Sequence, residues 1–419
     1  MENSAKAILA YIYKDIREYD EYYLQECREL CAAAEIEVIG EISQQARSIH
    51  PDTGFRAGKV EELRSMIKAL EADLVLFCSP VPPAVIHRLG ELLDLRVMDR
   101  TSLILHIFET RARTKEAKLQ VEIASLQHSL STITETNETE SHQRGGSVAN
   151  RGSGEMRSTL VHRQVENRIR QLKKELSVVE KDHRRAQERR QKSVIRRVAL
   201  VGYTNSGKSS LMNQMLKRNG LAKRQVEEKD MLFATLDTSV RRLRYQSREF
   251  LLYDTVGFIS RLPHELIESF RTTLSAASEA DLLLNVVDAS DPAYRQKEEI
   301  TLETLKHIQA DHLPVLTVYN KIDLLDSTDG LFGLTISCLT GEGIDELMAQ
   351  ITKVLYPAEE EMTCFLPYAK IGMLNRSRSV LRVETLEENE DGVYVRICGP
   401  MDYLRPYRSY RRNKKEGIQ

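Results

Sequence analysis

The segment "RRVALVGYTNSGKSS" places the strongest constraint on how this 419-residue chain can fold. An apolar run, of the kind that a buried strand contributes, is followed by a short loop and then by a helical pattern. Gly202, Gly207, Lys208 and Ser209 fit G-x-x-x-x-G-K-[ST] in that setting. We therefore expect backbone N–H groups to surround a phosphate, Lys208 to reach the β- and γ-phosphates, and the Ser209 hydroxyl to ligate Mg²⁺.

Strand–helix alternation around this motif predicts the fold class. Short apolar runs alternate with amphipathic segments over residues 1–105 and again over 196–357, which indicates two α/β domains with mainly parallel sheets. Residues 106–195 have the four–three apolar spacing of an antiparallel helical hairpin. We therefore expect an N-terminal α/β domain with that hairpin, a P-loop nucleotide-binding domain, and a small C-terminal α/β domain with a basic tail over residues 358–419.

The expected hairpin has an apolar seam, a polar tip and a basic second helix. The stretch 134–156 is polar and rich in Gly and Ser, so we expect a flexible tip loop there. The net charge of the chain is only −2, but residues 157–197 hold fourteen Lys and Arg against five Asp and Glu. Such segregation indicates a polyanion surface, and a solvated helix face is the alternative. The RNA-binding candidates are Arg151, Arg168, Lys173, Arg184 and Arg185. The seam is expected to contain Phe108, Ala112, Leu119, Ile123, Leu126, Leu130 and Ile133, then Val161, Val165, Ile169, Leu172, Leu176, Val179, His183 and Ala186.

The motif "DTVG", residues 254–257, is typical of the second switch loop of guanine-nucleotide hydrolases. Asp254 is placed to hold Mg²⁺ through water, and the Gly257 N–H to meet the γ-phosphate. Many such hydrolases continue with a glutamine that orients the attacking water, whereas this chain has Phe258, which has no hydrogen-bonding group. Because Asp254, Thr255, Val256 and Gly257 supply no certain catalytic side chain, we expect slow intrinsic hydrolysis that a partner stimulates.

The motif "NKID", residues 320–323, points to guanine as the base. The Asp323 carboxylate can accept hydrogen bonds from guanine N1–H and the exocyclic amine together, whereas adenine presents the opposite pattern there. Lys321 can lay its stem over the base, Asn320 can tie the loops together, and Ser337 with the Cys338 N–H suits the guanine carbonyl. The first switch needs a Mg²⁺-binding threonine, for which Thr235 and Thr238 both qualify by spacing.

The sequence resembles the HflX family of translational GTPases over nearly its full length. The matching stretches include "AGKVEEL", "DRTSLILHIF", "EAKLQVE", "RGSGE", "LFATLD", "DTVGFI" and "YNKID". The resemblance implies that Thr235 is the switch ligand for Mg²⁺, beside Ser209. The chain departs from the family pattern at Leu339, where a lysine is usual. The nucleotide-binding residues expected are Gly202, Tyr203, Thr204, Asn205, Ser206, Gly207, Lys208, Ser209, Ser210, Phe233, Ala234, Thr235, Leu236, Asp237, Asp254, Thr255, Val256, Gly257, Asn320, Lys321, Ile322, Asp323, Ser337, Cys338 and Leu339.

The resemblance also implies a function. We expect a cytoplasmic, Mg²⁺-dependent GTPase that binds GTP and GDP, associates with the large ribosomal subunit and its rRNA, and splits or rescues stalled ribosomes under stress. A nucleotide-gated anti-association or assembly factor, reset by hydrolysis, is the main alternative. A partner of a tRNA-modifying enzyme is a third, disfavoured because Cys364 and Cys398 form no C-terminal motif. We expect a monomer without membrane insertion, since no apolar run approaches a spanning length of about 18 residues.

Overall fold

The computed structural model describes residues 4–14, 21–143, 151–191, 195–221, 232–233, 239–246, 248–260, 276–356, 359–378 and 380–411, with side chains undescribed at 132–143, 151–159, 180, 182–191, 359 and 402. The chain divides into two compact units. The first holds Met1–Arg184, Lys229–Asp237 and Ile259–Thr272, and the second holds Arg185–Glu228, Thr238–Phe258 and Thr273–Gln419. The chain therefore passes between the units at both switch segments. Within the described ranges, no helix is long and apolar enough to cross a membrane.

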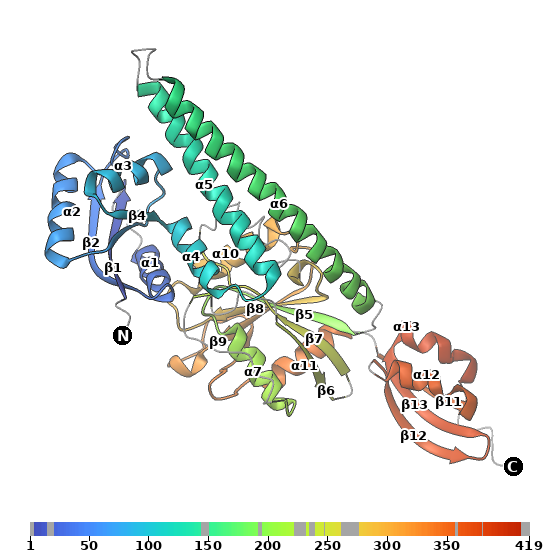
Figure 1. The fold of residues 1–419 in the computed structure, drawn as a ribbon. Helices are drawn as coiled ribbons and strands as arrows, with labels where there is room; N and C mark the ends of the chain where they lie inside the picture. Colours follow the sequence, from blue (N-terminus) through green and yellow to red (C-terminus); the bar gives the residue numbers. More distant parts are fainter. Residues whose placement is uncertain are drawn as a thin grey trace. The chain divides into compact units, whose positions relative to one another are not determined.

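A four-stranded parallel sheet, ordered β2-β1-β3-β4, organises the first unit (Figure 1). The strands β1 and β3 run nearly without polar interruption where they are buried, as strands covered on both faces do. Asp99 caps the helix after the last strand, because its side chain accepts a hydrogen bond from the Ser102 N–H. The elements are β1 (Ala5–Tyr13), α1 (Glu21–Ala33), β2 (Ile36–Gln45), α2 (Ala57–Leu70), β3 (Leu74–Phe77), α3 (Pro83–Leu93), β4 (Arg96–Asp99) and α4 (Arg100–Arg111).

Two long helices, α5 (Lys115–Gln143) and α6 (Arg151–Gln191), form the predicted hairpin (Figure 1). The expected tip loop 134–156 is too long, because residues 134–143 continue α5 and 151–156 belong to α6. This segment contains no proline, so a helix already formed can extend through it at one hydrogen bond per residue. The seam is confirmed for Leu119, Ile123, Leu126, Leu130, Val165, Ile169, Leu172, Leu176 and Val179. Val161 is 44% exposed, so its place in the seam was wrong, and Ile133, His183 and Ala186 lie outside the described side chains.

A six-stranded sheet, ordered β10-β9-β8-β5-β7-β6, forms the centre of the second unit (Figure 1). All its neighbouring strands are parallel except β6 and β7. Leu284 and Val286 of β8 pack with Met212 of α7 and Leu347 of α11, while Val287 packs near α10 on the other face. The elements are β5 (Arg196–Val201), α7 (Lys208–Arg218), β6 (Ser239–Tyr245), β7 (Arg248–Asp254), β8 (Leu282–Asp288), α10 (Tyr294–His307), β9 (Val315–Asn320), β10 (Leu334–Thr335) and α11 (Ile344–Leu355). The predicted α/β fold class with a P-loop domain is confirmed.

The C-terminal segment forms an antiparallel sheet ordered β11-β13-β12 within the same second unit. Its core contains Leu366, Ile397 and Tyr407, while Val380 joins the core of the six-stranded sheet. The elements are β11 (Glu359–Pro367), α12 (Ile371–Ser377), β12 (Arg382–Asn389), β13 (Gly392–Pro400) and α13 (Met401–Leu404). The four-part domain division at residues 105, 195 and 357 stays a prediction.

Candidate nucleotide site

The predicted phosphate loop lies between the end of β5 and the first residue of α7. Gly207, which caps α7, has φ 93°, and a Cβ there would lie 2.1 Å from the Asn320 Nδ2 atom. Only glycine accepts both that backbone conformation and that close approach. The residues of this loop are thereby brought to the N-terminus of α7, where backbone N–H groups and the helix dipole favour an anion.

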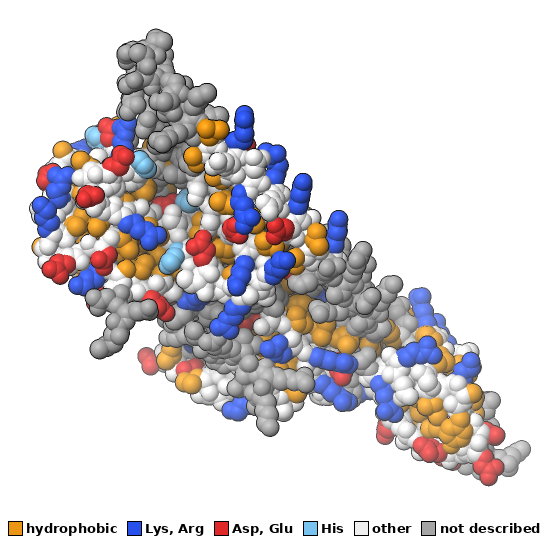
Figure 2. Space-filling view, viewed as in Figure 1, with side chains coloured by type: hydrophobic (Ala, Val, Ile, Leu, Met, Phe, Trp, Pro, Cys, Tyr) orange, Lys and Arg blue, Asp and Glu red, His pale blue; other side chains and the backbone are white. Residues whose placement is uncertain are grey.

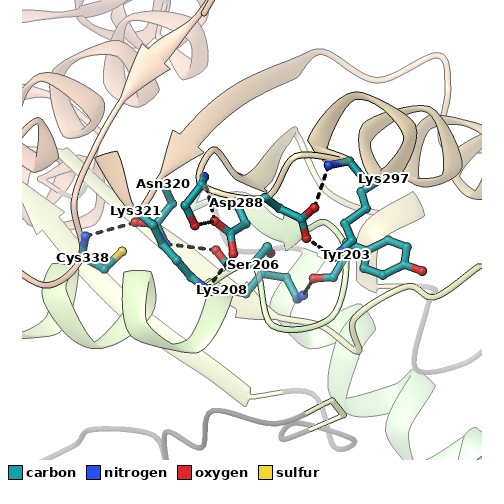
Figure 3. Close-up of polar contacts among 11 residues, drawn as sticks. Tyr203, Ser206, Lys208, Asp288, Lys297, Asn320, Lys321 and Cys338 are labelled. Atoms are coloured by element: carbon teal, nitrogen blue, oxygen red, sulfur yellow. Dashed lines mark hydrogen bonds and ion pairs between the residues drawn. The ribbon is translucent and has the colours of Figure 1, made fainter. Parts of the chain in front are cut away.

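Lys208 lies inside this loop and is 7% exposed (Figure 3). Its Nζ donates to the carbonyl oxygens of Gly202 at 3.1 Å and Tyr203 at 2.6 Å. Burial lowers the pKa of Lys208 to about 8, although the charge of Asp254 acts to raise it. A phosphate beside the ammonium would favour the charged form further, so the loop suits an anionic ligand.

Ser209 and Asp254 are the described residues that fit a Mg²⁺ ion. The Ser209 hydroxyl donates to Asp254 Oδ2 at 2.8 Å, and Asp254 is completely buried at the end of β7. A hydroxyl and a carboxylate side by side offer the hard oxygen ligands that Mg²⁺ prefers. Thr235, the other expected Mg²⁺ ligand beside Ser209, lies outside the described residues, as do Ala234, Leu236 and Asp237.

The second switch runs along the phosphate loop through backbone contacts. The Phe258 N–H donates to Gly202 O at 3.1 Å, and the Thr204 N–H donates to Phe258 O at 2.8 Å. A Cβ on Gly257 would lie 2.7 Å from Thr204 Cγ2 and 2.9 Å from Lys208 Nζ, so only glycine fits. Phe258 is 2% exposed and Val256 is 6% exposed. The phenylalanine thus anchors the switch where many relatives of this domain type have a polar side chain.

Thr255 is also structural in this position. It is fully buried, and its hydroxyl donates to the Leu200 carbonyl of β5 at 2.6 Å. This bond fixes the start of the switch to the central strand of the sheet.

Asn320 joins the phosphate loop to the loop after β10 (Figure 3). Its Nδ2 donates to Ser206 O at 3.0 Å, and its Oδ1 accepts from the Cys338 N–H at 3.1 Å. We expected the Cys338 N–H to meet the guanine carbonyl. That expectation needs correction, because the same N–H is engaged by the Asn320 side chain.

The predicted guanine-binding carboxylate, Asp323, is exposed beside the "NKID" turn. The Ser337 hydroxyl donates to Asp323 Oδ1 and accepts from the Thr340 N–H at 3.0 Å. Ser337 therefore orients Asp323, a role that the position of Ser337 in the sequence did not indicate. Ile322 is half-buried and Leu339 is 79% exposed at this edge.

Two further residues of this site were missed from the sequence (Figure 3). Asp288, the last residue of β8, pairs with Lys321 Nζ at 2.7 Å and so holds the lysine stem in place. Lys297 of α10 pairs with Asp291 and lies 5.0 Å from the centre of the Tyr203 ring. The strand-end aspartate in "VVDAS" was the available signal for Asp288.

Phe233 is the described part of the expected first switch. Its ring packs edge-on against Phe108 of α4, with the centroids 4.7 Å apart, and it is 2% exposed. Both residues belong to the first unit. Phe233 therefore anchors this segment on α4, and its expected place at the nucleotide stays a prediction.

The basic side chains of α6 gather on the outer edge of the hairpin, where Figure 2 shows them in blue. Arg168 is exposed and pairs with Glu122 of α5 at 2.7 Å, and Lys173 is exposed. The side chains of Arg151, Arg184 and Arg185 lie outside the described set. The other exposed basic residues of the described part of α6 are Arg163, Arg170, Lys174 and Lys181.

Three family models match successive parts of the chain. Models described as "GTP-binding GTPase N-terminal", "GTP-binding GTPase Middle Region" and "50S ribosome-binding GTPase" match residues 21–109, 111–191 and 197–321. Among solved structures, a GTP-binding protein from Sulfolobus solfataricus in complex with GDP aligns with a TM-score of 0.45 and 22% identity, covering 84% of this chain and 98% of that one.

Curated relatives match over almost the whole length. The GTPase HflX of Caldanaerobacter subterraneus subsp. tengcongensis is 37% identical over 380 residues, which is 90% of this chain and 87% of that protein. The GTPase HflX of Escherichia coli is 36% identical over 401 residues, which is 92% of this chain and 91% of that protein. The predicted GTP binding and GTP hydrolysis are confirmed at the level of the family. Identities of 37% and 36% over 90% and 92% of the chain show that it belongs to the HflX family of GTPases.

Proposed function

We propose that this GTPase associates with the large ribosomal subunit when GTP is bound and acts in splitting, rescuing or recycling ribosomes under stress. The basic face of α6 carries the proposal. In the part of α6 whose side chains are described, six Lys and Arg side chains are exposed, whereas the acidic residues there are Glu166 and Glu175. A helix that segregates charge in this way fits the phosphate backbone of RNA, where contacts are read by shape and charge.

The nucleotide site supplies the gate. Lys208, Ser209 and Asp254 surround the place where the γ-phosphate and Mg²⁺ are expected, and Mg²⁺ neutralises phosphate charge there when bound. Both switch segments lead from the second unit into the first, which contains the hairpin. A change at the γ-phosphate can therefore reach the proposed RNA surface through the chain itself.

The matched model description "50S ribosome-binding GTPase" supports this proposal for the P-loop domain. Phe258 supports the expectation of slow intrinsic turnover, because a buried phenylalanine orients no water. We also propose a cytoplasmic location and a monomeric state.

Sedimentation with large subunits tests the surface. We expect the double variant Arg170→Glu/Lys173→Glu to weaken binding in the presence of a non-hydrolysable GTP analogue, and to lower the salt slope by about one for each phosphate that the helix no longer neutralises. Nucleotide affinity should not change, because both residues lie in the first unit. Lys306→Glu/Lys353→Glu, two exposed lysines of the second unit, is the matched control. Equal binding by both double variants would count against α6 as the RNA surface.

A nucleotide-gated anti-association factor is the second candidate, and buried Phe258 favours it because such a factor needs hydrolysis only for release. Subunit splitting measured with the GTP analogue separates the two. Full splitting activity without hydrolysis supports the binder, whereas a single round followed by arrest supports a cycle that depends on hydrolysis for recycling.

A further inference from the structure

A buried ion pair links two helices of the first unit at a place that the sequence motifs did not indicate. Glu26 of α1 and Arg100 of α4 form the pair, and their side chains are only 3% and 7% exposed. The Arg100 guanidinium also lies 5.0 Å from the centre of the Tyr23 ring. Removing two charges from water costs several kcal/mol per ion, so a pair at this depth needs further hydrogen bonds to be stable.

Ser260 provides those hydrogen bonds. Arg100 Nη1 donates to Ser260 O at 2.7 Å, and Arg100 Nη2 lies 3.3 Å from the Ser260 hydroxyl. The Ser260 N–H donates to Glu26 Oε1 at 3.3 Å, and its hydroxyl donates to Glu26 Oε2. The backbone donor, the backbone acceptor and the hydroxyl of one residue are therefore all held by the same ion pair.

Ser260 lies two residues after Phe258, at the end of the second switch. Phe258 is fixed by backbone bonds to Gly202 and Thr204 of the phosphate loop, and Ser260 is fixed by α1 and α4. The division between the compact units falls between Phe258 and Ile259. Only Ile259, which is 1% exposed, separates the two anchored points, so little slack exists to absorb a shift at either one.

The first switch is held by α4, through a residue that also contacts α1. Arg111 of α4 donates through Nη1 to Leu232 O and through Nη2 to Ala33 O of α1, both at 2.8 Å. Phe233 packs on Phe108. Helix α4 therefore contacts both segments that must respond to the γ-phosphate, whereas α1 contacts the second directly and is linked to the first through Arg111.

We propose that Glu26 and Arg100 are positioning residues for GTP hydrolysis, which act through Ser260 on the backbone of residues 254–258. With Phe258 in place of a water-orienting glutamine, the attacking water depends on backbone groups of this switch. Their placement depends in turn on where the segment is anchored. The N-terminal domain thus sets the hydrolysis rate, and a partner that moves α1 against α4 changes that rate without touching the nucleotide.

Arg100→Lys in the full-length chain is the sharpest test. Lysine keeps the charge beside Glu26 but loses the fork that contacts Ser260 at two atoms. We expect kcat for GTP to fall by about 10- to 100-fold, as displacement of a reacting group by about 1 Å does. Affinity for a fluorescent GDP analogue should stay unchanged, since the phosphate and base loops are untouched.

Two further variants control for the loss of any Arg–Glu fork and for a charge left buried without its partner. Arg28→Lys is the matched control, because Arg28 of α1 makes a similar fork to Glu41 at 2.6 and 2.9 Å without contacting a switch; it should leave kcat unchanged. Glu26→Leu/Arg100→Met removes both charges together, so that neither is left buried without its partner, and should lower kcat as Arg100→Lys does. The proposal is overturned by an unchanged or raised kcat in both Arg100 variants, or by losses of kcat and nucleotide affinity in parallel.

Discussion

Replacing Asn320 with alanine should weaken nucleotide binding through the loops rather than by removing a direct bond to the nucleotide. Asn320 is 1% exposed and makes one bond to Ser206 O and one to the Cys338 N–H. It also fills the space beside Gly207, where no Cβ fits. Alanine removes both bonds and leaves one buried carbonyl and one buried N–H with no side-chain partner.

The expected magnitude follows from these two bonds. A neutral hydrogen bond contributes about 0.5 to 1.5 kcal/mol net, and each buried group left unsatisfied costs about 1 to 3 kcal/mol. Water and loop movement recover part of this cost, so we expect a loss of about 2 to 4 kcal/mol. If that loss falls on the ordered, nucleotide-binding state of the loops, it corresponds to an affinity about 30- to 800-fold lower for GDP.

Equilibrium titration of a fluorescent GDP analogue measures this loss, with Asn219→Ala as the control. Asn219 follows α7 in the same unit, and its side chain also donates once, to Met215 O at 3.0 Å, and accepts once, from the Arg244 N–H at 2.6 Å. It contacts neither the phosphate loop nor the "NKID" turn in these bonds. The reasoning is refuted if Asn320→Ala binds GDP as tightly as the wild type, or if Asn219→Ala loses as much affinity.

Three other predictions concern the switch, the core and pH. Phe258→Gln should leave intrinsic GTP turnover within about tenfold of the wild type, because position 258 is buried and its backbone is bonded to the phosphate loop. A rate about 10³-fold or more above the wild type, as glutamine-containing GTPases reach with their activators, would contradict this. Asn285→Leu should raise the free energy of unfolding by about 1 to 2 kcal/mol in calorimetry, because neither polar atom of this fully buried side chain has a partner among the described residues; a lower Tm would show that the amide is satisfied in solution. Burial raises the pKa of Asp99, but the hydrogen bonds from His128 and Ser102 and the His128 charge outweigh it, so the folded-state pKa lies below its ordinary value. Asp99 therefore stabilises the fold above its unfolded pKa of about 3.9, and the Tm difference between wild type and Asp99→Asn should shrink as pH falls through that range; a difference that does not shrink there would contradict it.

Local patterns predicted the elements and the motif loops well. The apolar runs before Gly202, Asp254 and Asn320 became β5, β7 and β9, because strands buried on both faces need continuous apolar sequence. The motif residues then met at one edge, since parallel strands carry their C-terminal ends to the same side of a sheet. The hairpin seam followed from its spacing for the same local reason.

The errors arose where a contact partner lies far along the chain. The Cys338 N–H is engaged by Asn320, and the contact of Phe233 with Phe108, 125 positions earlier in the sequence numbering, had no signal in the sequence. The Glu26–Ser260 bonds span 234 positions, and no spacing rule connects them. The predicted tip loop was too long for a different reason. Polar residues with Gly and Ser are compatible with both loop and helix, and the adjoining helices decide between the two.

The rate of GTP hydrolysis with and without purified large ribosomal subunits is the most direct test of a ribosome-gated switch that has Phe258 where many GTPases place a water-orienting glutamine. We expect slow turnover alone and stimulation of at least about tenfold by the subunits, a threshold that lies below the 10³- to 10⁵-fold effects known for partner-supplied catalysis. Lys208→Ala, which removes the buried ammonium from the phosphate loop, should show no turnover in either condition. Equal rates with and without subunits for the wild type would contradict the account.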